Sequence, residues 1–147
     1  MVDISQHPTG MDAAWVARDE TGCVAFFITA GEGPIPEVAL QQLQGDIWPE
    51  ELMAGLAKIG SCVLHVVVPN PSSFVALAER GVFVYDWSDI HRTEVDALGA
   101  YERVASPGAT INVESLKAAL GWSAGEIPLI CESFVQSTNV KVEGVKA

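Results

Sequence analysis

Apolar positions in the first thirty residues predict two neighbouring strands. We expect one strand over residues 13–17 and a second over residues 22–30, joined at Asp19-Glu20-Thr21-Gly22. An acidic pair followed by glycine is typical of a tight hairpin turn. The run over residues 23–28 is almost continuously apolar, so the second strand should be buried on both faces.

Two glycines and two prolines in residues 31–36 predict a structured loop, because both residue types interrupt regular structure. Apolar residues then recur at helical spacing and predict a short helix that begins at Pro36 and is broken at Gly45. A second helix should begin at Pro49, because the first residue of a helix makes no intrahelical hydrogen bond through its N–H. The acidic pair that follows interacts favourably with the positive end of the helix dipole. Its apolar positions continue to residue 59, and Gly60 should end it.

The most β-branched segment of the chain covers residues 62–68 and gives the clearest strand pattern. The histidine inside it, His65, is expected to be a hydrogen-bonded core residue. A helix should follow that segment and end at Gly81, and residues 82–85 predict the next strand. This strand–helix–strand unit is about the shortest crossover that can place two strands in parallel.

The last part of the chain predicts several short elements. They are strands over residues 100–105, 109–111, 128–134 and 140–145, and a helix over residues 113–120. Asn112 can cap that helix and Gly121 can end it. The polar segment before them, residues 87–99, is expected to be a surface loop or a short helical excursion.

Together these elements predict a single α+β domain over residues 1–147, with residues 1–10 frayed. Its sheet should be mixed but mainly antiparallel, with three to four short helices. The chain has 147 residues, which fits one hydrophobic core. Hydrophobic residues make up 49% of it and charged residues 18%, a balance that excludes general disorder.

The net charge of the chain restricts the classes of molecule that it is expected to bind. The formal net charge is −11, and nine acidic residues against two basic ones fall within the first sixty positions. Nucleic acid and anionic lipid both attract positive surfaces, so neither is an expected partner. A basic protein surface is the complementary partner.

The expected compartment is the cytoplasm. The first ten residues are polar and contain no basic start followed by an apolar run, and no stretch approaches the roughly 20 apolar residues that cross a bilayer. Cys23, Cys62 and Cys131 are widely spaced among apolar neighbours. We interpret them as reduced core thiols, because a reactive thiolate needs a polar, electropositive setting.

Motifs for chemistry are sparse. The glycine loop over residues 31–33 lacks the glycine and Lys-Ser/Thr pattern of phosphate loops, so we interpret it as a conformational turn. The cluster Asp86, Asp89 and His91 offers ligands for a divalent metal, yet no second ligand motif accompanies it. No nucleophile elbow or metalloprotease motif is present. We therefore predict a protein that is not an enzyme, with no cofactor, metal or catalytic residue.

Tryptophan and acidic side chains suggest a different kind of site. Trp15 should lie in the core, whereas Trp48, Trp87 and Trp122 fall at the junctions between elements. Core plugging is the default for such rings, but exposed rings beside carboxylates would combine aromatic anchors with negative charge. The candidate partner-binding residues are Glu32, Glu50, Glu51, Asp86, Trp87 and Asp89.

Two sets of segments resemble a group of small bacterial proteins that often occur as immunity proteins of polymorphic or secreted toxin systems. The first set is Trp15-Val16-Ala17-Arg18-Asp19 through Gly22, Val24-Ala25-Phe26, and Gly31-Glu32-Gly33-Pro34-Ile35-Pro36. The second is Gly81-Val82-Phe83-Val84-Tyr85-Asp86-Trp87 and Tyr101-Glu102-Arg103-Val104-Ala105-Ser106-Pro107. The resemblance implies a cytosolic, non-enzymatic protein that binds and blocks a cognate toxin, and it implies no catalytic residues.

The sequence thus leads to one main hypothesis and two alternatives. The main hypothesis is an immunity-type protein that occludes a basic surface of a toxin. The first alternative is a structural or regulatory domain without a toxin partner, forming a homodimer through an edge strand. The second is a metal-dependent hydrolase built on Asp86, Asp89 and His91.

Overall fold

The computed structural model describes residues 10, 13–45, 47–87, 100–122 and 127–144. Within them the chain forms one mixed seven-stranded sheet, in the order β3-β5-β4-β2-β1-β6, with β7 paired to β5. The strands are β1 (Ala14–Asp19), β2 (Val24–Ile28), β3 (Cys62–Leu64), β4 (Phe83–Trp87), β5 (Tyr101–Pro107), β6 (Leu129–Cys131) and β7 (Asn139–Val140). The helices are the 3-10 helix η1 (Glu37–Leu43), α1 (Pro49–Ala54), α2 (Ser72–Glu79) and α3 (Val113–Leu120). The predicted α+β fold class is confirmed.

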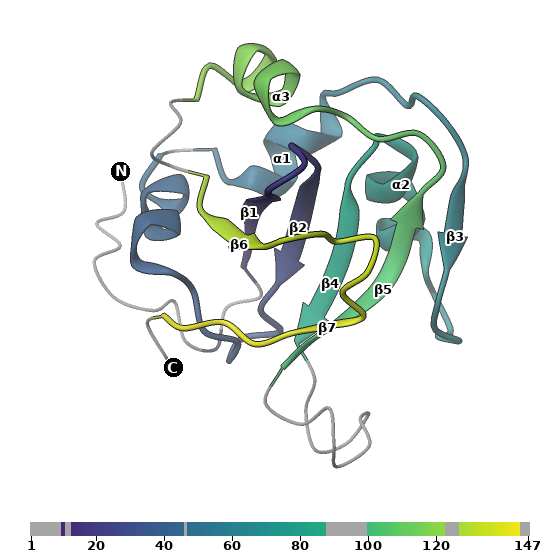
Figure 1. Ribbon diagram of the computed structural model, residues 1–147, viewed down its shortest axis with the longest axis horizontal. Coiled ribbons are helices and arrows are strands. Elements are labelled where there is room, and N and C mark those ends of the chain that lie inside the picture. The colour runs from purple at the N-terminus through teal and green to yellow at the C-terminus, as the bar shows by residue number, and fades with distance from the viewer. Residues whose placement is uncertain (1–9, 11–12, 46, 88–99, 123–126, 145–147) are drawn as a thin grey trace.

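Both parallel and antiparallel pairs build the sheet. β1 pairs antiparallel with β2, and β5 pairs antiparallel with β3, β4 and β7. The parallel pairs are β1 with β6 and β2 with β4. The sheet is therefore mainly antiparallel, as predicted. Because β3 and β4 are both antiparallel to β5, they run in the same direction with β5 between them (Figure 1).

Helices and loops cover the sheet on both faces, and each face has its own core (Figure 1). One core contains Trp15, Phe27 and Tyr85, whose rings stack across β1, β2 and β4 at centroid distances of 4.4 and 4.8 Å. Residues of η1 and the chain around Phe134 close over this face. The opposite core is covered by side chains of α1, α2 and α3. Burial on both faces explains the continuous apolar run of β2.

Local sequence signals account for the hairpin and for α3. The β1–β2 turn falls at residues 19–22, where the amide of Gly22 donates to the carbonyl of Asp19 at 3.2 Å. The Asn112 side chain caps α3 by accepting from the amide of Glu114 at 2.7 Å. Gly121 ends α3 in the left-handed conformation, with φ of 70°, which glycine adopts without steric cost.

The structure corrects the prediction for residues 62–68. Only residues 62–64 form a strand, and this strand lies at the edge of the sheet with Val63 57% exposed. His65 is exposed rather than buried in the core, and its Nε2 lies 2.7 Å from the Ser106 hydroxyl. The apolar pattern of residues 62–68 predicted a buried strand. In the structure this segment lies at the edge of the sheet, so much of it is exposed.

Smaller differences concern the ends of elements. The helix predicted between Pro36 and Gly45 is the 3-10 helix η1, and the one beginning at Pro49 ends at Ala54 rather than near residue 59. Residues 109–111 form no strand, although Asn112 bridges to Cys23. The strands predicted over 128–134 and 140–145 are shorter, as β6 and β7. The predictions for residues 1–9 and 88–99 lie outside the described residues.

Candidate partner-binding site

Three of the predicted site residues, Glu32, Asp86 and Trp87, lie at one end of the sheet. β2 and β4 are parallel, so their last residues, Ile28 and Trp87, lie at the same end of the sheet, where the antiparallel β5 begins. We call this end the carboxyl edge. In open sheets with parallel strands, the carboxyl ends of the strands are the usual place for binding sites.

The loop after β2 carries Glu32 on the carboxyl edge. The carbonyl of Thr29 accepts from the amides of Glu32 and Gly33 at 3.1 and 2.8 Å, which closes a tight turn. Gly33 is packed so closely that a Cβ there would lie 2.4 Å from the Tyr101 hydroxyl and 3.2 Å from the Trp87 ring. The turn is therefore anchored to the core while Glu32 itself is exposed.

Trp87 and Asp86 lie at the end of β4, on opposite faces of the sheet. The Trp87 ring packs edge-on against Tyr101 at a centroid distance of 5.1 Å and is partly buried, so it plugs the core more than it projects from the surface. Asp86 is only 6% exposed and faces Glu102 across the β4–β5 register. Both carboxylates line a cavity of about 440 Å³ with Phe74 and the chain after β3.

Glu50 and Glu51 occupy the first turn of α1, both exposed. Pro49 begins this helix, and Trp48 precedes it with its indole N–H donating to the carbonyl of Leu43 at 3.0 Å. The carboxylates lie near the positive end of the helix dipole, which stabilises the helix while leaving their charge on the surface.

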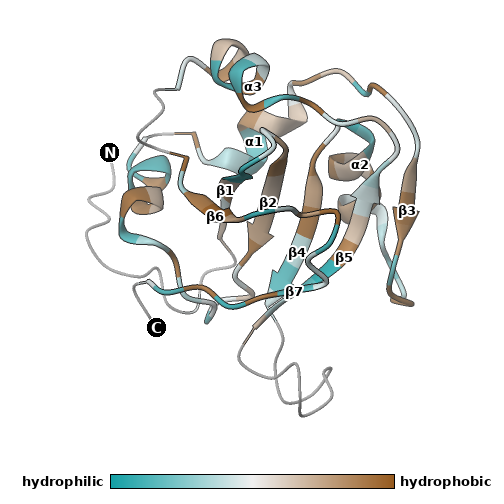
Figure 2. Cartoon of the chain, viewed as in Figure 1, coloured by the Kyte–Doolittle hydropathy of each residue, from teal (hydrophilic) through white to brown (hydrophobic). Residues whose placement is uncertain are grey.

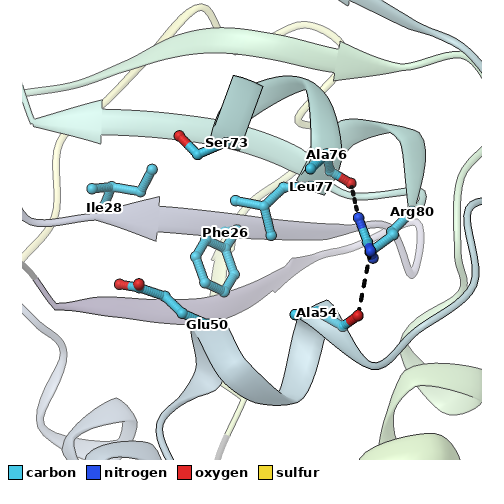
Figure 3. A pocket seen from close by; sticks show the side chains of 8 residues that line it. All are labelled: Phe26, Ile28, Glu50, Ala54, Ser73, Ala76, Leu77 and Arg80. Atoms are coloured by element: carbon cyan, nitrogen blue, oxygen red, sulfur yellow. Dashed lines mark hydrogen bonds between the residues drawn. The ribbon is translucent and has the colours of Figure 1, made fainter. Parts of the chain in front are cut away.

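A groove of about 370 Å³ separates α1 from α2 (Figure 3). Phe26 and Ile28 of β2 form its floor, and Glu50 lies toward the end where Ile28 is. Arg80 closes the opposite end, donating to the carbonyls of Ala76 at 2.7 Å and Ala54 at 3.3 Å. The groove is thus apolar along its floor and acidic toward the carboxyl edge.

Most basic side chains among the described residues are bound within the chain. Lys58 and Lys117 form ion pairs with Glu79 and Glu114 at 3.4 and 3.1 Å. Three arginines instead donate to backbone carbonyls: Arg18 to Ile127, Arg80 to Leu56, Ala76 and Ala54, and Arg103 to Phe134 and Val135. A cation held by internal carbonyls does little to attract an anionic partner, so the acidic charge dominates the surface.

The predicted partner-binding residues therefore divide into groups. Glu32 lies at the carboxyl edge beside Gly33, which packs against Trp87 and Tyr101. Glu50 lies on α1 toward the Ile28 end of the groove, and Glu51 is exposed in the same helical turn. Asp86 offers little accessible surface and lies in the wall of the cavity that it shares with Glu102 and the chain after β3. Asp89 lies outside the described residues. Sequence reasoning missed Glu102, which a correct β4–β5 register would have found.

The described residues contain no set of three His, Cys, Asp or Glu side chains that could hold a metal ion. Burial raises the pKa of the Cys131 thiol, and burial followed by the charge of Glu79 raises that of Cys62. These two thiols are therefore less reactive than an ordinary cysteine. Across the described part of the chain, every helix is too short or too polar to cross a bilayer.

Comparison with known proteins adds no relative: no protein-family model, curated protein or solved structure matches the chain. The fold and the carboxyl edge are therefore the observations on which a functional proposal rests.

Proposed function

We propose that this chain is a cytoplasmic, non-enzymatic binding protein of the immunity type, which neutralises a bacterial toxin by covering a basic surface of the toxin. The observation that carries the proposal is the exposed acidic surface formed by the carboxyl edge and the first turn of α1. Glu32 is exposed at the carboxyl edge and Glu50 and Glu51 on the first turn of α1, while five basic residues are held by internal contacts. The resemblance of the opening and central segments to immunity proteins points in the same direction.

Inhibition of the toxin by this surface would be steric and electrostatic and would need no catalytic residue. A toxin that acts on nucleic acid carries a basic cleft for the phosphate backbone. Exposed carboxylates can occupy such a cleft and exclude its substrate. The field of a chain with net charge −11 would also accelerate encounter with a basic partner. The groove between α1 and α2 adds apolar surface beside Glu50, over which the aliphatic stem of a lysine or arginine can pack.

The test is co-production with the product of the adjacent gene, the toxin that the proposal expects, with growth and binding as the measurements. The triple variant E32K/E50K/E51K should lose protection and bind the toxin at least about tenfold more weakly. Raising the ionic strength should slow association of the unaltered protein, because screening acts on the long-range attraction.

A matched control reverses three exposed acids at the opposite end of the sheet. Glu20 lies in the β1–β2 turn, Glu132 directly follows β6, and Glu114 lies in the first turn of α3, close to the bridge between Asn112 and Cys23. E20K/E114K/E132K changes the net charge by the same amount and should keep protection. If both triple variants lost protection equally, net charge rather than a particular surface would account for the effect. If the unaltered protein did not bind the toxin, the proposal would be refuted.

A further inference from the structure

β3 is an edge strand with apolar side chains on the surface. Its only strand partner among the described residues is β5. Val63 and Leu64 are 57% and 37% exposed, and Val67, in the chain after β3, is fully exposed. Figure 2 shows hydrophobic colouring along β3 and the chain that follows it, at the margin of the molecule farthest from β6.

This edge lacks the charges that usually protect an edge strand. Residues 59–78 contain no Asp, Glu, Lys or Arg, in a chain that is 18% charged. Edge strands of monomeric proteins commonly carry lysine or other charges that prevent pairing with another chain. The prolines nearby, Pro69 and Pro71, follow β3 rather than interrupt it.

The hydrogen bonds to β5 fix which backbone groups of β3 point outward. Gly108 donates to the carbonyl of Ser61 at 2.7 Å, and His65 donates to the carbonyl of Val104 at 2.9 Å. Residues 61 and 65 therefore turn their backbone groups toward β5, and residue 63, two positions from each, does the same. By alternation, the N–H and C=O groups of Cys62 and Leu64 point away from the sheet.

We infer that β3 pairs with β3 of a second copy of this chain, antiparallel and across a two-fold axis at Val63. The outward groups of Cys62 and Leu64 are symmetric about Val63, so each can exchange hydrogen bonds with the other residue on the second copy. Such self-complementarity is what a two-fold interface requires. Residues 62–64 carry no charge, so pairing across this axis sets no like charges directly opposite each other in two chains of net charge −11.

Sedimentation of the full chain tests the inference. We expect a species of twice the 15.6 kDa chain mass at protein concentrations on the order of 100 µM. V63K places two lysines face to face on the axis and should give a monomer. V135K alters a residue that is 62% exposed outside the strands, and it should leave the dimer intact. A monomer at every concentration, or a dimer that survives V63K, would overturn the inference.

Cross-linking tests the register without depending on lysine. In a background with the three native cysteines changed to serine, V63C should form an intermolecular disulfide under mild oxidation. Directly opposed residues in a non-hydrogen-bonded pair have Cα atoms about 4.5 Å apart, within the range for disulfides. V135C is the control and should cross-link far more slowly. Equal cross-linking rates for V63C and V135C would contradict the proposed register. V63K should still protect against the toxin, because the β3 surface is distinct from the carboxyl edge.

Discussion

At the scale of single residues, Asp19 shows how one buried carboxylate connects distant parts of the chain. Its Oδ1 accepts from the amides of Thr21 and Cys23 and from the Thr21 hydroxyl, at 2.9, 3.0 and 2.7 Å. Its Oδ2 accepts from the amide of Phe134 at 2.9 Å. The first three bonds form the hairpin turn, and the fourth ties that turn to the segment after β6. Asp19 is therefore structural, although it is acidic.

We predict that D19N lowers the free energy of unfolding by about 1–3 kcal/mol, because the new NH₂ group faces N–H donors that lose their acceptor. E20Q is the matched control: Glu20 is the exposed neighbour, and its change should stay within about 0.5 kcal/mol. Urea denaturation of both variants measures the difference. An equal, small effect in the two variants would show that the carboxylate is dispensable.

At the scale of elements, η1 completes the pairing of β1. Gln42 is buried, and its side-chain amide pairs with the backbone of Val16: Oε1 accepts from the Val16 N–H at 2.7 Å, and Nε2 donates to the Val16 carbonyl at 2.8 Å. β6 pairs only with the last two residues of β1. A glutamine on η1 thus takes the place of a neighbouring strand at Val16.

Q42A should lower the free energy of unfolding by about 2–4 kcal/mol, since it leaves a buried N–H and a buried C=O without these partners. Q41A changes the exposed glutamine beside it and should have little effect. The comparison is made by chemical denaturation. A Q42A variant as stable as Q41A would mean that water replaces the side-chain amide at β1.

Elements could be predicted from sequence where their signals are local. The hairpin at residues 19–22 and the ends of α3 at Asn112 and Gly121 follow from neighbouring residues, and they were predicted correctly. Pairing between distant segments has no local signal. The register that sets Asp86 beside Glu102, and the edge position of β3, depend on the order of strands in the sheet. For that reason the sequence identified candidate acidic residues but did not predict which of them lie close together in the fold.

At the scale of the whole molecule, two buried tyrosines link stability to pH. The Tyr101 hydroxyl donates to the carbonyl of Pro34 at 2.9 Å and accepts from the Trp15 indole N–H, and that of Tyr85 donates to the carbonyl of Ser137. Burial raises the pKa of both hydroxyls above the ordinary value. In the unfolded chain they ionise near pH 10. Their contribution to stability is therefore present below about pH 10 and lost as the pH rises toward their native pKa.

We predict that the free energy of unfolding falls steeply above about pH 10, and that Y101F falls less steeply although it is less stable at neutral pH. Equilibrium denaturation at a series of alkaline pH values measures both slopes. The comparison between variants separates the tyrosine from Cys62 and Cys131, whose raised pKa acts in the same direction in both proteins. Identical slopes would contradict a buried, protonated Tyr101.

The insertion of β5 between β3 and β4 has a consequence for how the chain is made. β3, α2 and β4 emerge from the ribosome before β5, and β1 must wait longer still for β6. Until residues 101–107 are synthesised, β4 has an open side that β5 will later fill. Such long-range pairing is slow to form, because the chain loses loop-closure entropy before the stabilising contacts between the strands are made. The nascent chain therefore passes through a period in which the unfilled side of β4 is open to capture by chaperones or by other copies.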